Sequence, residues 1–135
     1  MIKATMGKEI VFKTINDIGV ISGVSKSLAQ RGISMSAMSA WVEGAYGIIH
    51  LVTDDNLRAL DCLKKQFQLR ENGVILVELP HKVGMLKRVT DKLKAEGIDI
   101  HHLYATALPD HGKSLVVFST ANNDRALLAL KKMKK

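Results

Sequence analysis

The sequence predicts an α+β fold in which one βαββαβ module occurs twice. Residues 17–33 align with residues 82–98 at a constant offset of 65, which pairs Gly19 with Gly84. Farther along the chain, Arg58-Ala-Leu matches Arg125-Ala-Leu at an offset of 67. In both halves the spacing of apolar residues changes between the period of a strand and that of a helix. The chain is therefore interpreted as a duplication.

The first half begins with a strand and a helix. Residues 8–14 alternate in hydropathy and predict a strand with one buried face. That face is Ile10, Phe12 and Thr14, set against Glu9, Val11 and Lys13. The helix that follows ends at Gly32, because a glycine with an apolar residue directly after it is a typical helix C-terminus. The buried stripe of this helix is Ile21, Val24 and Leu28.

A hairpin, a second helix and a strand complete the first half. Residues 33–41 alternate, residues 43–47 form a turn, and residues 48–52 are a short apolar run, which together predict the hairpin. The segment Asp54-Asp55-Asn56 offers helix N-caps. The predicted buried stripe of this helix is Leu57, Leu60 and Leu63. A possible strand over residues 67–71 runs into the next strand at residues 73–79.

The second half repeats this order with a hairpin over residues 98–118 and a helix that starts near Asn122. The predicted architecture is two ferredoxin-like βαββαβ modules, residues 1–72 and 73–135, each an antiparallel sheet with both helices on one face. The second module lacks its final strand, because residues 130–135 read as a basic helix tail. We expect residues 1–6 or a strand of another chain to supply it, which favours a homodimer.

Composition limits the functional classes. The chain has 135 residues, 47% of them apolar, and one cysteine, Cys62, which excludes an internal disulfide. No apolar run approaches the roughly 20 residues of a membrane-spanning helix, and residues 1–10 lack the apolar stretch of a signal peptide. These features predict a soluble, cytoplasmic protein with no membrane partner.

The net charge of +7 raises the question of nucleic acid. Four of the 20 basic residues lie at the C-terminus and would form a solvated helix end. They are Lys131, Lys132, Lys134 and Lys135. Aromatic residues make up only 4% of the chain, which leaves little material for stacking on bases. Nucleic-acid binding is therefore disfavoured, and the alternative that stays open is a protein that binds nucleic acid or another anionic partner through the basic C-terminal helix.

The repeated loop between the first strand and first helix of each half resembles that of ACT domains, small regulatory modules that sense amino acids. The resemblance rests on Asn16-Asp17-Ile18-Gly19-Val20-Ile21 and on Leu79-Pro80-His81-Lys82-Val83-Gly84-Met85-Leu86. It also includes the helix ends Gln30-Arg31-Gly32-Ile33-Ser34 and Ala95-Glu96-Gly97-Ile98-Asp99. It covers nearly the whole chain as a tandem pair.

The resemblance implies that an amino acid or similar small metabolite is held by this loop against the strand of a neighbouring module. The implied ligand-binding residues of the first half are Asn16, Asp17, Ile18, Gly19, Val20 and Ile21. Asn16 or Asp17 would accept hydrogen bonds from the ammonium group. The physical chemistry agrees, because the open N–H groups at a helix N-terminus attract a carboxylate.

The second loop reverses the charge, since His81-Lys82 replaces Asn16-Asp17. The first loop is therefore expected to be the main site. The second loop, with candidate residues His81, Lys82, Val83, Gly84 and Met85, would be an interface or would take a more acidic group. The structural alternative also stays open: both glycines serve helix packing only, and Asp17 is an exposed cap.

Other candidate sites are weaker. Ser36 and Met38 lie on the second strand and either line the ligand pocket or belong to a half-buried strand. Trp41 is expected to be a core residue and Tyr46 a turn residue. His101 and His102 are adjacent on a strand and point to opposite faces, so they do not chelate one metal ion. Phosphate-binding loops and paired cysteines are absent from the sequence.

The sequence therefore predicts a regulatory protein rather than an enzyme. No nucleophile, base and orienting residue are arranged together, so no catalytic residue and no cofactor is expected. A dimer would bind its ligand at a module interface and modulate a partner enzyme in trans, since no catalytic domain is seen in this sequence.

Overall fold

The computed structural model describes residues 2–133, with the backbone alone at residues 108 and 109. Met1 and the tail residues Lys134 and Lys135 lie outside the described residues. The predicted α+β class with antiparallel sheets and helices is confirmed. The chain forms two compact units: unit 1 is Met1–Gly7 with Gly73–Lys135, and unit 2 is Lys8–Asn72.

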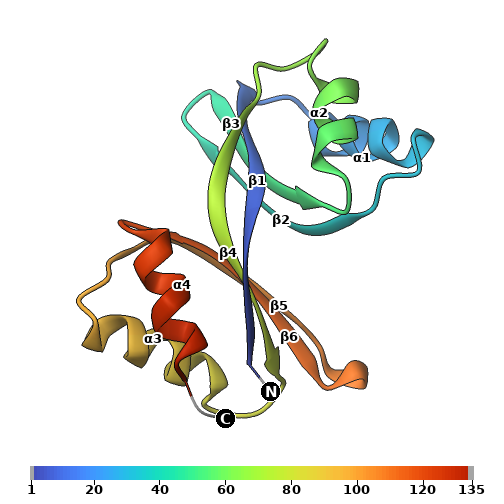
Figure 1. Ribbon diagram of the computed structural model, residues 1–135. Helices are drawn as coiled ribbons and strands as arrows, with labels where there is room; N and C mark the ends of the chain where they lie inside the picture. The colour runs from blue at the N-terminus through green and yellow to red at the C-terminus, as the bar shows by residue number, and fades with distance from the viewer. Residues whose placement is uncertain (1, 134–135) are drawn as a thin grey trace. The chain divides into compact units, whose positions relative to one another are not determined.

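Unit 2 is a four-stranded sheet with two helices on one face (Figure 1). Its elements are β1 (Lys3–Ile15), α1 (Val20–Gln30), β2 (Met35–Glu43), β3 (Tyr46–Thr53), α2 (Asn56–Leu63) and the start of β4 (Arg70–Pro80). The strand order is β2-β3-β1-β4, and β3 pairs antiparallel with both β1 and β2. In the register, Ile49 of β3 lies opposite Phe12 on one side and Ala40 on the other.

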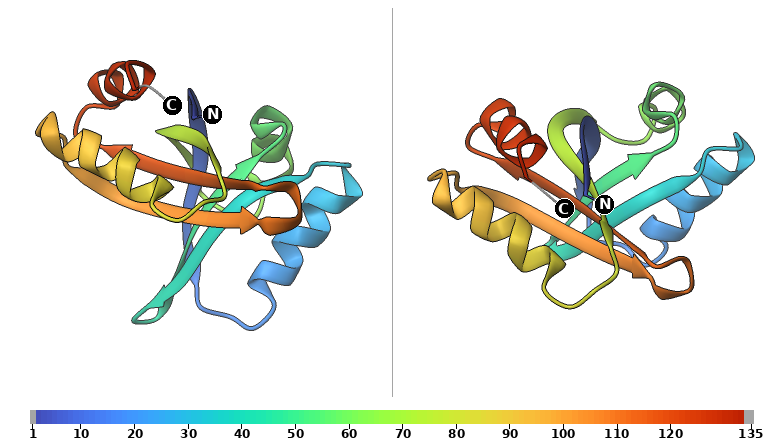
Figure 2. Two further views of the ribbon diagram at one scale, coloured as in Figure 1. Left: turned by 90° about the horizontal axis from the view of Figure 1, so that it is seen from below. Right: turned by 60° about the horizontal axis from the view of Figure 1, so that its bottom comes forward.

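Unit 1 repeats this arrangement. Its elements are the rest of β4, α3 (Met85–Ala95), β5 (Ile100–Leu108), the 3-10 turn η1 (Pro109–His111), β6 (Lys113–Thr120), α4 (Asn123–Lys131) and the start of β1. The strand order is β1-β4-β6-β5, with β6 antiparallel to β4 and β5. Figure 2 shows α3 and α4 on one face of these strands.

The core of each unit lies between its sheet and its helices. In unit 2, α1 and α2 contribute Val24, Leu28, Ala59 and Leu63, which pack against the strand residues Ile10, Phe12, Ile49 and Leu51. In unit 1, α3 and α4 contribute Val89, Leu93, Ala126 and Leu130, which pack against Ile75, Val77, Leu79, Val116 and Phe118. In each unit, the alternating apolar residues of the strands and the helix residues at i, i+4 spacing thus pack together in one apolar layer.

Several expectations about burial are wrong. Leu57 is 80% exposed, because α2 buries positions at i, i+4 spacing, Ala59 and Leu63, and Leu57 is on the other side of the helix. Glu9 and Val11, expected to face solvent, are 0% and 3% exposed. Glu9 has polar partners within unit 2: Asn72 donates a hydrogen bond to it at 2.9 Å, and His50 Nδ1 lies 3.0 Å from its carboxylate.

The helix ends agree with the sequence. Gly32 adopts a left-handed conformation with φ +68°, and the N–H of Ile33 donates a hydrogen bond to the carbonyl of Leu28 at 3.0 Å. Gly97 has the same φ, and Ile98 bonds to Leu93 in the same way at 2.9 Å. The predicted helix C-terminal motif is therefore present in both units.

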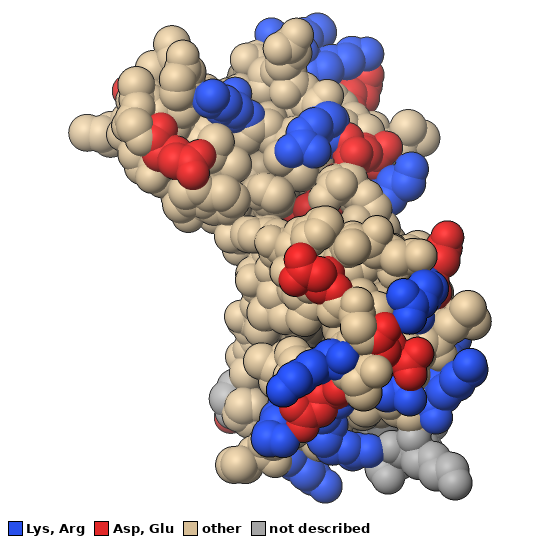
Figure 3. Space-filling view, turned by 90° about the vertical axis from the view of Figure 1, so that its left-hand side faces the viewer, with Lys and Arg blue, Asp and Glu red and all other residues tan. Residues whose placement is uncertain are grey.

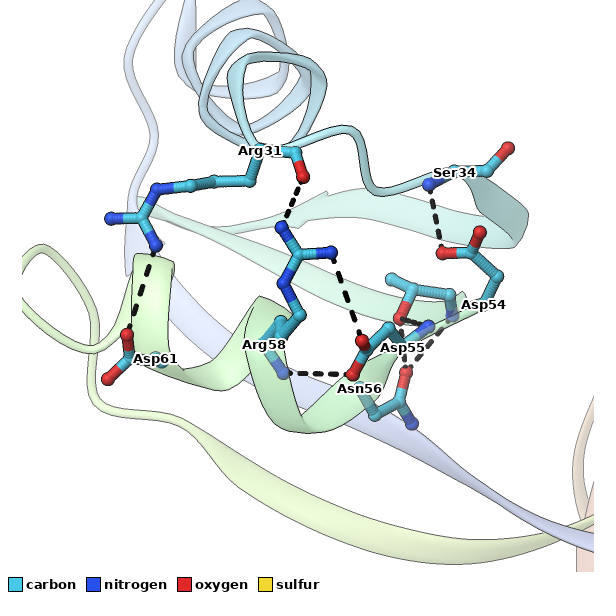
Figure 4. A network of polar contacts seen from close by, with 8 residues as sticks. Arg31, Ser34, Asp54, Asp55, Asn56, Arg58 and Asp61 are labelled. Atoms are coloured by element: carbon cyan, nitrogen blue, oxygen red, sulfur yellow. Dashed lines mark hydrogen bonds and ion pairs between the residues drawn. The ribbon is translucent and has the colours of Figure 1, made fainter.

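The structure explains why Arg58-Ala-Leu is repeated at Arg125. The Arg58 guanidinium donates a hydrogen bond to the carbonyl of Arg31, just past the end of α1, and the Arg58 N–H is capped by Asp55 at 3.1 Å (Figure 4). In unit 1, Arg125 donates to the carbonyl of Glu96 at 2.7 Å, and Asn122 caps its N–H at 3.1 Å. The arginine thus ties the second helix of each unit to the end of the first.

None of the helices in the described part of the chain has the length and apolar character needed to cross a membrane.

Candidate functional site

A pocket of about 230 Å³ lies in unit 2 where β1 turns into α1. The loop contributes Asn16 and Asp17, and the first turn of α1 contributes Val20 and Ile21. The remaining walls come from the strands, through Thr14, Ile15, Ala40, Trp41, Val42, Gly47, Ile48 and Ile49. Most of this lining is apolar, and Asp17 is its one ionisable carboxyl group.

The backbone of this loop is shaped by Gly19. Its φ of +98° is left-handed, which a residue with a side chain adopts only with strain. The N–H of Asn16 bonds to the carbonyl of Ala45 at 2.9 Å, and the N–H of Val20 bonds to the carbonyl of Asp17 at 3.3 Å. These two bonds hold the loop against the β2–β3 turn and close the bend into the helix.

The N-terminus of α1 differs from that of α2 in unit 2. A side chain caps α2, since Asp55 accepts a hydrogen bond from the N–H of Arg58. At α1 the N-cap is Gly19, and no side chain of the described residues caps the helix. Apart from the N–H of Val20, which bonds to Asp17, the first-turn N–H groups of α1 and the positive end of its dipole are therefore open to an anionic group.

Together these features suit a zwitterion with an apolar side chain. The helix end favours a carboxylate, and the carboxylate of Asp17 favours an ammonium group. The apolar strand residues favour the burial of a hydrocarbon group. An α-amino acid carries all three groups within a few ångströms of one another.

Unit 1 has a pocket of about 420 Å³ at the equivalent place. It is lined from the β4–α3 loop and α3 by Leu79, His81, Lys82, Gly84, Met85, Leu86 and Lys87, and from the strands by Ala105, Thr106, Ala107, Ser114 and Val116. Gly84 is left-handed with φ +88° and is not capped by a side chain within residues 2–133. The N–H of His81 bonds to the carbonyl of Gly112 at 2.8 Å, as Asn16 does to Ala45.

The structure brings most of the residues expected at the ligand site into these two pockets. Asn16, Asp17, Val20 and Ile21 line the first pocket, and His81, Lys82, Gly84 and Met85 line the second. Gly19, the N-cap of α1, lies in the same loop of unit 2 but does not line the pocket. Ile18 and Val83 occupy the same place in the two loops and are fully exposed to solvent.

Two expected residues lie elsewhere. Met38 packs against the core of unit 2, and Ser36 is exposed; neither lines the pocket. The residues of β2 that do line it are nearer its C-terminal end: Ala40, Trp41 and Val42. The sequence contains no signal for this choice, because serine and methionine recur along the strand.

Trp41 is not the core residue that the sequence predicted. It is 37% exposed and borders the pocket, and its ring stacks on His50 with centroids 5.3 Å apart. By strand alternation, its side chain leaves the sheet on the face opposite to Ala40 and Val42. Tyr46, the expected turn residue, begins β3, and Lys13 lies over its ring.

The other candidates remain apart from the pockets. His101 lies 3.8 Å from Asp99, whereas the ring of His102 contacts that of Tyr104. No cluster of three metal-ligating side chains occurs among the residues that the structure describes. On the face in Figure 3, Lys and Arg side chains are interspersed with Asp and Glu. The described end of the basic tail, Lys131 and Lys132, is exposed.

Solved structures of other proteins share this fold. No family model matches the chain. No curated protein matches it either. Among solved structures, protein BT0572 from Bacteroides thetaiotaomicron superposes with a TM-score of 0.87 at 27% identity, over 96% of this chain and 89% of that one.

The regulatory subunit of aspartate kinase from Thermus thermophilus matches with a TM-score of 0.67 at 15% identity, over 98% of this chain and 97% of that one. The corresponding subunit from Thermus flavus matches with a TM-score of 0.62 at 16% identity, over 96% of this chain and 95% of that one. The fold is ACT-like. This agreement in fold supports the resemblance that the two loops suggest, and both pockets lie at those ACT-like loops.

Proposed function

We propose that this is a non-catalytic regulatory protein that binds an amino acid in the pocket of unit 2 and modulates a partner enzyme in trans. The observation that carries the proposal is the pocket itself. It combines an open helix N-terminus at Gly19, the carboxylate of Asp17 and an apolar wall. The similarity in fold to regulatory subunits of aspartate kinase supports a regulatory role.

The proposed ligand lies with its carboxylate at the first turn of α1 and its ammonium group at Asp17. Each contact with an exposed helix end contributes roughly 0.3–1 kcal/mol. Such contacts alone give weak binding, so burial of the ligand's side chain is expected to supply most of the affinity. The pocket is open in a single chain, and a wall from a second copy would complete it.

We propose that this second copy docks at the edge strand β2. The strand is nine residues long, is the outer strand of unit 2, and contains neither lysine nor proline. Long apolar edge strands without such protection pair readily with another chain. Val42 at 58% and Met35 at 39% exposure provide apolar surface along this edge. A homodimer in which the ligand stabilises one geometry would pass the signal to the partner by differential affinity.

A thermal-shift screen of the twenty amino acids tests the proposal. A ligand that binds only the folded state raises the melting temperature, so one or a few of the twenty should do so. Asp17→Asn should reduce the shift, because it removes the charge that pairs with the ammonium group. Asp61→Asn is the matched control, since Asp61 is an exposed carboxylate on α2 outside the pocket.

Two outcomes would contradict the proposal. The first is a screen in which no amino acid raises the melting temperature at millimolar concentration. The second is a shift that survives Gly19→Val unchanged, because the added side chain strains the loop that forms the pocket. If the protein instead binds DNA with an affinity that falls steeply with added salt, the basic C-terminal helix is the functional surface.

A further inference from the structure

We propose that the pocket of unit 1 takes a small dianion rather than a zwitterion, so that the two units respond to chemically different ligands. The inference rests on the proposed function only in treating the loop pockets as ligand sites. It is carried by a comparison of the two pockets position by position. Their backbones correspond, whereas the side chains around them differ in one consistent direction.

The correspondence is shown by the register of the strands. Trp41 lies opposite Ile48 in unit 2, and Thr106 lies opposite Leu115 in unit 1. Because these pairs are related by the same offsets as the sequence repeat, ten of the twelve lining residues of one pocket have a counterpart in the lining of the other. Differences between counterparts can therefore be compared as substitutions at one site.

Three of these differences add a cation or a hydrogen-bond donor to unit 1. In each pair the unit 2 residue comes first: Asp17 and Lys82, Ser22 and Lys87, Gly47 and Ser114. The first pair inverts the charge beside the helix end. A ligand ammonium group that Asp17 attracts would be repelled by Lys82.

The charges in the unit 1 pocket are only partly neutralised. Lys87 forms an ion pair with Asp91 one turn farther along α3. Lys82 has no ion-pair partner among the described residues. No Asp or Glu lines the pocket. An anionic ligand is therefore the group that would balance Lys82.

The polar wall provides orientation. His81 Nδ1 lies 3.3 Å from the hydroxyl of Ser114, which places an imidazole and a hydroxyl side by side in the pocket lining. Hydroxyl and ammonium donors around an uncapped helix end suit oxygen-rich anions such as phosphate monoesters or dicarboxylates.

The long-range field acts in the same direction. Unit 1 has 12 basic and six acidic residues, a net charge of +6, whereas unit 2 has eight and seven, a net charge of +1. A dianion is therefore concentrated near unit 1 before any contact forms. The larger volume, about 420 Å³ against about 230 Å³, also leaves room for the solvated oxygens of such a ligand.

The experiment is a titration of the isotope-labelled full chain followed by amide NMR shifts. The probes are sn-glycerol 3-phosphate and succinate, with alanine as the zwitterion and inorganic sulfate as the simple anion. We expect saturable shifts at residues 82–87 with one of the two organic dianions, and a weaker response to alanine. The organic dianion that binds more tightly identifies the phosphate monoester or the dicarboxylate as the ligand class.

The variants are Lys82→Asp, which restores the residue of unit 2, and Lys94→Asp, which makes the same change of charge on α3 outside the pocket. Lys82→Asp should weaken dianion binding about tenfold or more, as expected for loss of a charge-assisted hydrogen bond, and Lys94→Asp should not. Any of four results would overturn the inference. Both variants could weaken dianion binding equally, or sulfate could bind as tightly as the organic dianions. Alternatively, alanine could cause the stronger shifts, or no saturable shift could occur at residues 82–87.

The same spectra separate this inference from the proposed function. Amides of residues 16–22 report the pocket of unit 2, and their response to amino acids is read independently. If no amino acid shifts the amides of residues 16–22 but a dianion gives saturable shifts at residues 82–87, the proposed ligand of unit 2 is rejected and this inference is supported. The reverse pattern would reject this inference alone.

Discussion

The indole ring of Trp41 stacks on the imidazole of His50, with the ring centroids 5.3 Å apart and the planes inclined by 23°. His50 in turn lies 3.0 Å from the buried carboxylate of Glu9. Trp41 therefore connects the rim of the unit 2 pocket to a polar group inside the molecule. It is also the only tryptophan of the chain, which makes it a natural reporter.

Occupation of the unit 2 pocket should change the fluorescence of Trp41. A ligand beside the indole displaces water from its edge, and emission should shift or change in intensity with the same saturation curve as calorimetric binding. Asp17→Asn should weaken both curves together. Calorimetric binding at the NMR-assigned unit 2 pocket with unchanged Trp41 emission would show that the ligand does not reach this wall.

The two capped helices should depend on their caps, and α1 should not. Asp55→Ala and Asn122→Ala each remove a side chain that accepts a hydrogen bond from the backbone, so each should lower the free energy of unfolding by about 1 kcal/mol. Asp17→Ala, beside the uncapped α1, should change it by less than about 0.5 kcal/mol. Urea denaturation measures all three, and a loss at Asp17 equal to that at Asp55 would contradict the structure.

Two glycines four residues apart should respond in opposite ways to alanine. Gly19→Ala forces a side chain into a left-handed conformation and should cost about 1–2 kcal/mol, although a Cβ there meets no atom within 4 Å. Gly23 lies inside α1, where a Cβ also has open space, so Gly23→Ala should stabilise the protein by about 0.5–1 kcal/mol. Chemical denaturation should give opposite signs, and equal signs would mean that strain at Gly19 does not matter.

Asp61 should titrate below the ordinary range of an aspartate. A hydrogen bond and the charge of Lys64, 2.9 Å away, lower the pKa of this carboxyl, and Arg31 adds to the effect (Figure 4). The folded state therefore binds this proton less readily than the unfolded state. The resulting stability is present above the unfolded pKa, close to 3.8, and is lost as the pH falls through the folded pKa.

Lys64→Met should return the pKa of Asp61 toward its ordinary value, as measured from the carboxyl carbon shift during an acid titration. Lys26→Met is the control, because Lys26 lies on α1 and is not among the residues that shift this pKa. An Asp61 that titrates normally in the unmodified protein would mean that the Lys64 contact does not persist in solution.

The fold was largely predictable because its elements depend on local patterns. The glycine-ended helices and the alternating strands each follow from a few neighbouring residues, and both were found at the expected positions. The sequence left open whether residues 1–6 or another chain supply the last strand of the second module, and the continuity of β1 from Lys3 to Ile15 was not predictable in this way. The segment from Lys3 to Gly7 has weak alternation, and its place as a strand follows from contacts with β4, such as Gly7 with Leu76, far along the chain.

The loop residues of the candidate site were predictable from the sequence, whereas the strand residues that line the pocket were not. Gly19 and Asp17 stand out because a tight turn before a helix has few chemical solutions. The contribution of Ala40 and Val42 depends on how far β2 runs beside β3, which the sequence does not specify. Glu9 was missed for a similar reason, since its partners His50 and Asn72 come from two other strands.

The sharing of β1 and β4 between the two units has a consequence for synthesis. Lys3 and Gly7 are translated before unit 2, whereas their unit 1 contacts, Glu78 and Leu76, follow about seventy residues later. Residues 3–7 therefore have no β4 partner while all of unit 2 is translated. A ribosome-bound chain stalled before β4 would leave residues 3–7 without their strand partner, and during that interval this segment is most open to pairing with another chain.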